Sequence, residues 1–217
     1  MTSLRRFDLT RGALTSDDER TVVDRLMRGA LVVYPTDTLY AIGCRALDAA
    51  PVRALRSAKA RDADKALPVI AASLDQVRSF TREWSREAER LAAFFWPGPL
   101  TLILNASVAV PPEVIASTDS VAVRVPSSRF ATRLAELAGP LISTSANLAG
   151  EPPCVTVDLA LTAFPAATLA FDAGPLDGAP STIVETRAMG VRVIREGRVS
   201  AEAIRSCLGS TVEIETI

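Results

Sequence analysis

The amino-acid sequence predicts a single α/β domain, a twisted mixed sheet flanked by helices. Its 217 residues are enough to bury one sizeable hydrophobic core. Short apolar runs of strand length are interspersed with segments whose apolar residues recur at helical spacing. These strands and helices do not alternate strictly, which favours a mixed sheet over an all-parallel one.

Helices are predicted where a capping residue precedes apolar residues three or four positions apart. Ser16 and Glu19 form a capping-box signal, and the apolar stripe that follows ends at Gly29. Ser128 begins another amphipathic segment, which ends at Gly139. Further helices are expected at 48–59, 74–80, 85–95, 157–164 and 201–208.

Strands are predicted where short apolar runs are bounded by turn residues. Pro35 ends the run 31–34, and the sequence Trp-Pro-Gly-Pro at 96–99 forces a turn before the run 100–104. Other strands are expected at 41–44, 67–72, 121–125, 141–143, 168–172, 182–185 and 191–195. No linker or repeat interrupts the chain, so we expect one domain over residues 1–208 and a loosely held tail over 209–217.

Composition excludes several classes of protein. The chain has no histidine, which rules out Ser-His-Asp and Cys-His catalysis and His-ligated zinc. Lys+Arg total 24 and Asp+Glu 25, a formal net charge of −1, which disfavours a globally basic nucleic-acid binder. The three cysteines, Cys44, Cys154 and Cys207, are too few and too far apart for a disulfide framework or a CxxC site.

No targeting or membrane segment is recognisable. The first ten residues lack the apolar core of a signal peptide. No apolar run approaches the roughly 18 residues that a membrane-spanning helix needs. We therefore expect a cytoplasmic protein that does not enter a membrane.

The basic residues are biased towards arginine, with 22 arginines and only two lysines, Lys59 and Lys65. Most of the arginine excess we attribute to coding bias. A phosphate contact that needs the compact charge of lysine would resist this bias, so Lys59, Arg61 and Lys65 are candidates for a phosphate clamp. The alternative is structural, because cations at the end of a helix are favoured by the helix dipole.

Two further segments place polar groups at the end or centre of apolar strands. The run 34–40 presents Thr36, Asp37 and Tyr40 just after a strand, either as a ligand site or as an ordinary turn with Asp37 as its cap. Arg124 lies in an apolar strand, where an unpaired charge is costly. It is expected to bind either an internal carboxylate or the carboxylate of a ligand.

A row of small polar side chains is predicted at 143–147. In extended chain Ser143, Ser145 and Asn147 share one face, which favours a ligand surface over the alternative of an N-cap cluster. Ser181 begins a later strand and Arg195 ends the next one, and each alone is a weak signal. No glycine-rich phosphate loop of a standard type occurs.

Taken in order, these segments resemble the YrdC-like family, the L-threonylcarbamoyladenylate synthases. The matching segments are Tyr-Pro-Thr-Asp-Thr at 34–38 with Tyr40 and Gly43, Lys59-x-Arg61 with Lys65, Trp-Pro-Gly-Pro-Leu-Thr at 96–101, Val-Arg-Val-Pro at 123–126, Ser-Thr-Ser-Ala-Asn at 143–147 with Gly150, Pro-Ser-Thr-Ile-Val at 180–184, and Arg-Glu-Gly at 195–197. The chain departs from the family at Ala41, Asp62 and Ala66, where glycine or proline is common. It resembles the short single-domain form.

The resemblance implies a nucleotidyltransferase that makes threonylcarbamoyl-AMP and pyrophosphate from L-threonine, bicarbonate and ATP, in a large cationic cavity. The product feeds N6-threonylcarbamoyladenosine formation in tRNA through a downstream threonylcarbamoyl transferase. Mg²⁺ is expected to arrive with ATP. We name no protein metal ligand and expect a monomer with at most a weak contact with tRNA.

The resemblance also assigns residues. Lys59, Arg61 and Lys65 are expected to be catalytic. The implied ATP and phosphate contacts are Lys59, Arg61, Ser143, Ser145, Asn147, Ser181 and Arg195. The implied threonine contacts are Thr36, Tyr40 and Arg124.

Two other functions remain open at this stage. One is a non-catalytic module of the same fold that binds tRNA or double-stranded RNA, against which stand the few aromatics (5%) and the lack of a basic stripe. The other is a carbamoyl-adenylating maturation domain that uses carbamoyl phosphate.

Overall fold

The computed structural model describes residues 3–60, 64–148, 150–176, 178–187, 190–209 and 213–216. Within them the strands form two sheets, both of which contain parallel and antiparallel pairs. The smaller sheet has the order β1 (Arg5–Asp8), β10 (Leu169–Asp172), β2 (Val32–Pro35), β3 (Tyr40–Gly43), β9 (Thr144–Ser145). The larger has the order β13 (Ile214–Thr216), β12 (Val191–Arg195), β11 (Thr182–Thr186), β6 (Leu100–Ala106), β7 (Ser120–Arg124), β4 (Val69–Ile70), β8 (Leu141–Ile142), with β5 (Thr81–Arg82) also on β6.

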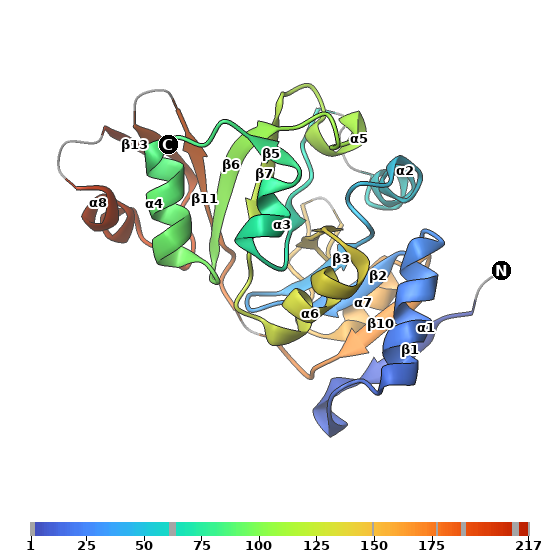
Figure 1. Cartoon of the computed structure of the whole chain (residues 1–217). Helices are drawn as coiled ribbons and strands as arrows, with labels where there is room; N and C mark the ends of the chain where they lie inside the picture. The colour runs from blue at the N-terminus through green and yellow to red at the C-terminus, as the bar shows by residue number, and fades with distance from the viewer. Residues whose placement is uncertain are drawn as a thin grey trace.

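Helices cover both sheets. They are α1 (Ser16–Met27), α2 (Ala49–Ala58), α3 (Leu74–Arg78), α4 (Arg86–Phe95), α5 (Pro112–Ile115), α6 (Arg129–Ala138), α7 (Val157–Ala163) and α8 (Ala201–Leu208), with a 3₁₀ turn η1 (Leu9–Arg11) after β1. Figure 1 shows α4 and α8 beside the larger sheet and α1 and α6 beside the smaller one. None of the helices described here is long and apolar enough to cross a bilayer.

The strands β2 and β3 of the smaller sheet are buried on both faces, as their unbroken apolar runs predict. Val32 and Tyr34 pack with α1 and α6, whereas Val33 and Ile42 face the main core that the two sheets share. All four side chains are fully buried. The alternation follows from the two-residue repeat of a strand and fixes which side chains can reach the space between the sheets.

The mixed α/β fold class is confirmed, but the single sheet we expected is divided in two. Residues 141–145 pass from one sheet to the other, because β8 pairs with β4 and β9 pairs with β3. The crossing is tight at Gly43, where a Cβ would lie 1.9 Å from the carbonyl oxygen of Ile142. Only glycine allows this approach.

Several element boundaries differ from the prediction. The capping box of α1 is formed by Thr15 and Asp18, one residue before the predicted pair. The short elements β1, β5 and α5 were not predicted, since two to four residues carry too little periodicity. In the segment expected to be a loose tail, Ile214–Thr216 pair with β12 as a parallel edge strand, so this part is held by backbone hydrogen bonds.

Candidate active site

A cavity of about 450 Å³ lies between the two sheets. One side is formed by the turn after β2 together with β3 and β9, and the other by β6, β7, β11 and β12. Isoleucines of the larger sheet, Ile103, Ile183 and Ile194, give this side an apolar wall. The predicted site residues that line the cavity are Thr36, Tyr40, Arg124, Ser143, Ser145, Ser181 and Arg195.

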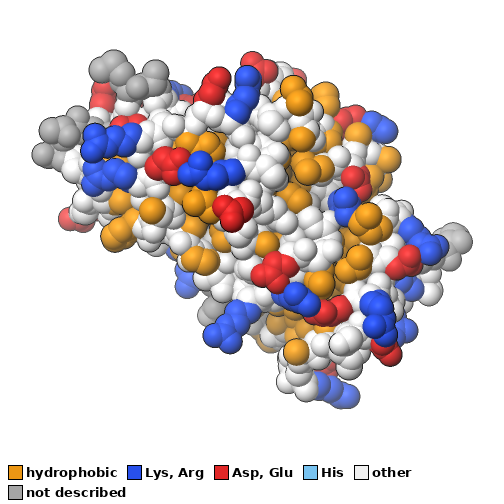
Figure 2. Space-filling model, in the orientation of Figure 1, with side chains coloured by type: hydrophobic (Ala, Val, Ile, Leu, Met, Phe, Trp, Pro, Cys, Tyr) orange, Lys and Arg blue, Asp and Glu red, His pale blue; other side chains and the backbone are white. Residues whose placement is uncertain are grey.

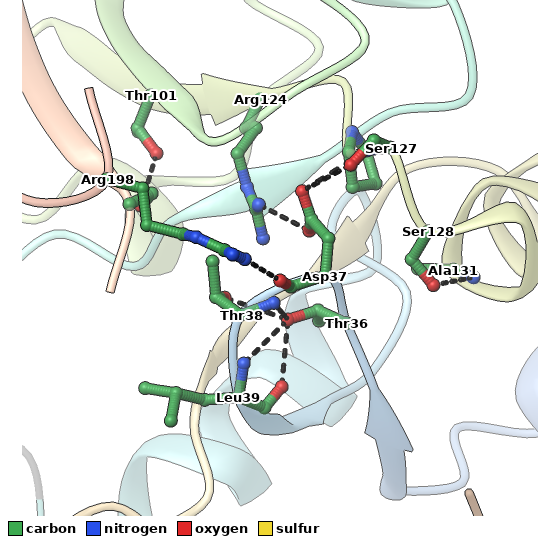
Figure 3. A network of polar contacts seen from close by, with 12 residues as sticks. Thr36, Asp37, Thr38, Leu39, Thr101, Arg124, Ser127, Ser128, Ala131 and Arg198 are labelled. Carbon is green, nitrogen blue, oxygen red and sulfur yellow. Dashed lines mark hydrogen bonds and ion pairs between the residues drawn. The ribbon is translucent and has the colours of Figure 1, made fainter. Parts of the chain in front are cut away.

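The turn at 36–39 is built by the hydroxyl of Thr36. Its Oγ1 accepts hydrogen bonds from the backbone N–H of Thr38 (3.1 Å) and Leu39 (3.2 Å) and lies 2.8 Å from the carbonyl oxygen of Leu39. Figure 3 shows these contacts converging on one oxygen. Thr36 therefore shapes the cavity rim, and the turn is capped by this hydroxyl and not by Asp37.

Arg124 answers one question that the sequence left open, since its internal partner is Asp37. Its Nη1 lies 2.6 Å from Asp37 Oδ1, and the two side chains are only 7% and 10% exposed. The other carboxylate oxygen of Asp37 accepts from Ser127 Oγ at 2.9 Å and Ser127 N at 3.3 Å. Arg124 is thus fixed at the cavity wall by Asp37, which Ser127 holds in turn (Figure 3).

Burial and the charge of Arg124 act in opposite directions on the pKa of Asp37. Burial by itself raises the pKa of this carboxyl, but Arg124 and the hydrogen bonds from Ser127 outweigh it and hold the pKa below its ordinary value. Asp37 is therefore ionised at neutral pH and balances one of the two arginine charges that line the cavity.

This pair predicts an acid-sensitive contribution to stability. Because the folded-state pKa is depressed, the contribution is present above about pH 4, the unfolded value, and is lost as the pH falls through the folded pKa. We expect the difference in unfolding free energy between the wild type and Asp37→Asn to be largest near pH 7 and to shrink below pH 4. Urea unfolding across this range measures it, and a difference that is independent of pH would contradict the assignment.

Arg195 is the second arginine at the cavity. Its guanidinium donates to the backbone carbonyl of Ser181 from Nε (3.2 Å) and Nη2 (2.7 Å), and within the described part of the chain it forms no ion pair. Burial, and then the charge of Arg124, lower its pKa, yet a guanidinium remains protonated at neutral pH. The Ser181 hydroxyl lies 3.0 Å from that of Thr101. This corner therefore carries a positive charge that a bound anion can neutralise.

The hydroxyl row is only partly on the cavity surface. Ser143 and Ser145 line it, but Asn147 does not. The amide of Asn147 donates to the carbonyls of Leu148 (3.1 Å) and Glu151 (2.6 Å), and its Oδ1 accepts from Ser145 Oγ. The extended conformation ends at Ser145, so the two-residue repeat does not continue to position 147.

Lys59 lies behind this row. It follows the last turn of α2, is 5% exposed, and donates from Nζ to the carbonyls of Ser145 (2.6 Å) and Asn147 (2.7 Å). Its charge thus supports the loop that carries the hydroxyls. Lys65 is exposed and accepts from Arg56 through its backbone carbonyl (2.8 Å), whereas the predicted clamp residue Arg61 lies outside the described residues.

Tyr40 is engaged by the backbone of another loop. Its hydroxyl donates to Gly174 O at 2.8 Å and accepts from Ala173 N at 2.9 Å, and burial raises its pKa. The ring remains part of the cavity wall. Its position joins β3 to the segment after β10.

Ser127 and Thr101 are site residues to which the sequence assigned no role, and Asp37 was considered as a ligand-site residue or a turn cap but not as the partner of Arg124. Asp37 and Thr101 both stand in segments that the sequence singles out. Their partners are distant in the chain, since 87 residues separate Asp37 from Arg124. The signal in the sequence was Arg124 itself, because a charged side chain in an apolar strand predicts a carboxylate partner without saying which one.

Comparison with known proteins decides the family. The model of the Sua5/YciO/YrdC domain, described as "Telomere recombination", matches residues 24–197. The chain belongs to this family. Members of the Sua5/YciO/YrdC family include the threonylcarbamoyl-AMP synthase of Pyrococcus abyssi, 36% identical over 187 residues, which cover 85% of this chain and 55% of that protein. The threonylcarbamoyl-AMP synthase of Vibrio parahaemolyticus is 37% identical over 145 residues, 65% of this chain and 78% of its own.

A solved structure extends the match to nearly the whole fold. The crystal structure of P. abyssi Sua5 complexed with L-threonine superposes with a TM-score of 0.89 at 31% identity, over 99% of this chain and 63% of that one. The chain therefore spans little more than half the length of the P. abyssi protein but most of the length of the Vibrio one.

Proposed function

We propose that this chain is an L-threonylcarbamoyladenylate synthase. The observation that carries the proposal is the cavity between the sheets, where Arg195 has a charge that no described carboxylate neutralises and Arg124 stands beside it. Such a cavity is suited to several anions at once. Family membership, and a relative of similar fold crystallised with L-threonine, support the choice of substrates.

The proposed reaction joins three negatively charged groups. The threonine amine and bicarbonate form an N-carboxylate with loss of water. A carboxylate oxygen then attacks the α-phosphorus of ATP, the bond to the bridging oxygen breaks, and pyrophosphate leaves. Fixed cations assist such a step by holding the reactants together and stabilising charge on the phosphoryl oxygens.

We propose roles within this reaction that agree with the positions of the residues and with the family resemblance. Arg124 has N–H groups beyond the one that binds Asp37, and we assign it to the threonine carboxylate. Thr36 shapes the turn at that end, and the ring of Tyr40 closes the wall. Arg195 and Ser181, with Ser143 and Ser145, are assigned to the phosphates and ribose.

The clamp residues are assigned by the family resemblance and by the support that Lys59 gives to the loop. Lys59 holds the backbone at Ser145 and Asn147, so that Asn147 contributes by fixing this loop. We assign Arg61 and Lys65 to the leaving pyrophosphate. Mg²⁺ is proposed to enter on the phosphates of ATP, since it binds phosphates with few protein groups.

The test of the proposed function is substrate omission. Pyrophosphate release is measured with L-threonine, bicarbonate and ATP together, and with each one left out in turn. We expect release only with all three, and equal release without threonine or without bicarbonate would contradict the proposal. Carbamoyl phosphate replaces threonine and bicarbonate in a parallel reaction, and turnover there would indicate a carbamoyl-adenylating domain instead.

A non-catalytic RNA-binding module is the other rival function. Figure 2 shows basic and acidic side chains interspersed on the face it presents, which gives an RNA backbone no continuous basic track there. Salt-dependent tRNA binding by a chain without ATP turnover would favour this rival. We propose instead a monomer that makes a small-molecule product and passes it to a threonylcarbamoyl transferase, with at most a weak contact to tRNA.

A further inference from the structure

Arg198 lies in the loop between β12 and α8, and backbone hydrogen bonds hold this loop against β11 and the residues before it. Its backbone N–H donates to Pro180 O at 3.1 Å. On either side, the N–H groups of Gly197 (2.9 Å) and Val199 (3.0 Å) donate to the hydroxyl oxygen of Thr182, which is fully buried. A Cβ on Gly197 would lie 2.2 Å from Pro180 O, so this loop is packed as tightly as backbone allows. The Arg198 side chain therefore starts from a fixed point.

From that point the side chain reaches the turn of the smaller sheet. Nη1 of Arg198 donates to the backbone carbonyl of Asp37 at 2.6 Å, across 161 residues of sequence. Figure 3 shows Arg198 and Arg124 converging on Asp37, one on its carbonyl and the other on its carboxylate. Asp37 is thus held at its backbone by Arg198, from the loop after β12, and at its side chain by Arg124, from β7.

The hydrogen bond from Arg198 to Asp37 restrains the turn and is not part of the hydrophobic core. Arg198 is exposed, and among the described residues its guanidinium has this one hydrogen bond and no ion pair. A single exposed hydrogen bond adds little to global stability. It does determine where the carbonyl of Asp37 lies, and this carbonyl belongs to the turn whose Thr36 and Thr38 line the cavity.

We propose that Arg198 is a positioning residue that restrains the 36–39 turn and so keeps the Asp37–Arg124 pair in place to receive the carboxylate of the amino-acid substrate. Arg198 is not among the residues that line the cavity, so it acts through Asp37. Two arginines and one aspartate also leave this corner with one positive charge in excess, which favours a carboxylate. That the carboxylate is that of L-threonine rests on the proposed function.

The test compares Arg198→Ala, Arg198→Lys and a control, Arg205→Ala, which removes an exposed arginine from α8. L-threonine and ATP binding are measured by calorimetry, and hydrogen exchange is measured at the amides of Thr38 and Leu39. For Arg198→Ala we expect threonine Kd to rise about five- to tenfold and exchange at these amides to accelerate about tenfold, with ATP Kd within about twofold of the wild type. Arg198→Lys, which keeps a charged donor, should recover part of both effects, and Arg205→Ala should match the wild type.

Two results would overturn the proposal. One is unchanged exchange at Thr38 and Leu39 in Arg198→Ala, which would mean that Arg198 does not restrain the turn. The other is faster exchange with an unchanged threonine Kd, which would reduce Arg198 to a structural contact. If the wild type itself binds no threonine, the proposed function fails, and the exchange measurement, made without substrate, still decides whether the turn is restrained.

Discussion

Arg195→Ala is expected to lower kcat/KM for ATP by about 100-fold or more while changing the free energy of unfolding by less than about 1 kcal/mol. The side chain lines the cavity and donates to one backbone carbonyl, so little of the fold depends on it. Its loss removes the one cavity-lining arginine that has no described carboxylate partner, and with it a charge-assisted contact to the phosphates.

Matched variants separate the charge from the geometry of Arg195. Arg195→Lys keeps the charge but not the planar pair of donors, and we expect it to recover activity to within about tenfold of the wild type. Arg86→Ala, which removes an exposed arginine at the start of α4, controls for the loss of net charge. Steady-state kinetics at fixed ionic strength make the comparison, and wild-type kcat/KM in Arg195→Ala would refute its role at the phosphates.

Lys59→Met is expected to abolish most of the activity, with kcat/KM reduced by about 100-fold or more, and to lower the free energy of unfolding by about 1–3 kcal/mol. Methionine keeps an apolar side chain of similar length but lacks Nζ, which lies 5.6 Å from the centre of the Phe164 ring and donates to Ser145 O and Asn147 O. The two carbonyls then lose these donors, and the loop that carries the hydroxyls loosens.

Kinetics and urea unfolding of the same Lys59→Met protein test both halves of this prediction. Lys65→Met is the matched control for stability, because its side chain is exposed and its carbonyl contact to Arg56 is retained. An unfolding free energy equal to that of the wild type would show that Lys59 does not support the loop. Full activity of Lys59→Met would show that Lys59 has no role in the active site.

The two lysines illustrate how far the sequence alone reaches. Their isolation among 22 arginines drew attention to the 59–65 segment. The sequence left a phosphate clamp and a structural role at a helix end as alternatives. The structure shows a buried contact that neither alternative describes fully, because the two carbonyls that accept from Lys59 lie in a loop 86 and 88 residues away. No local pattern encodes that meeting.

Arg124 and Asn147 also show how far local rules reach, since the prediction succeeded for Arg124 and failed for Asn147. The cost of burying an unpaired guanidinium predicted a carboxylate for Arg124, and Asp37 provides it. For Asn147 the two-residue repeat of a strand predicted a cavity position, and this failed where the strand ends two residues earlier. Local rules therefore identified the polar segments and the fold class, whereas the division into two sheets and the pairing across them depend on tertiary contacts.

The most direct test of the account identifies the product made from ¹³C-bicarbonate, L-threonine and ATP. Mass spectrometry should find one molecule that contains AMP, threonine and a single ¹³C atom, formed in step with pyrophosphate. A threonine–AMP anhydride without the labelled carbon, or pyrophosphate with no labelled product, would contradict the assignment of this cavity to threonylcarbamoyl-AMP synthesis.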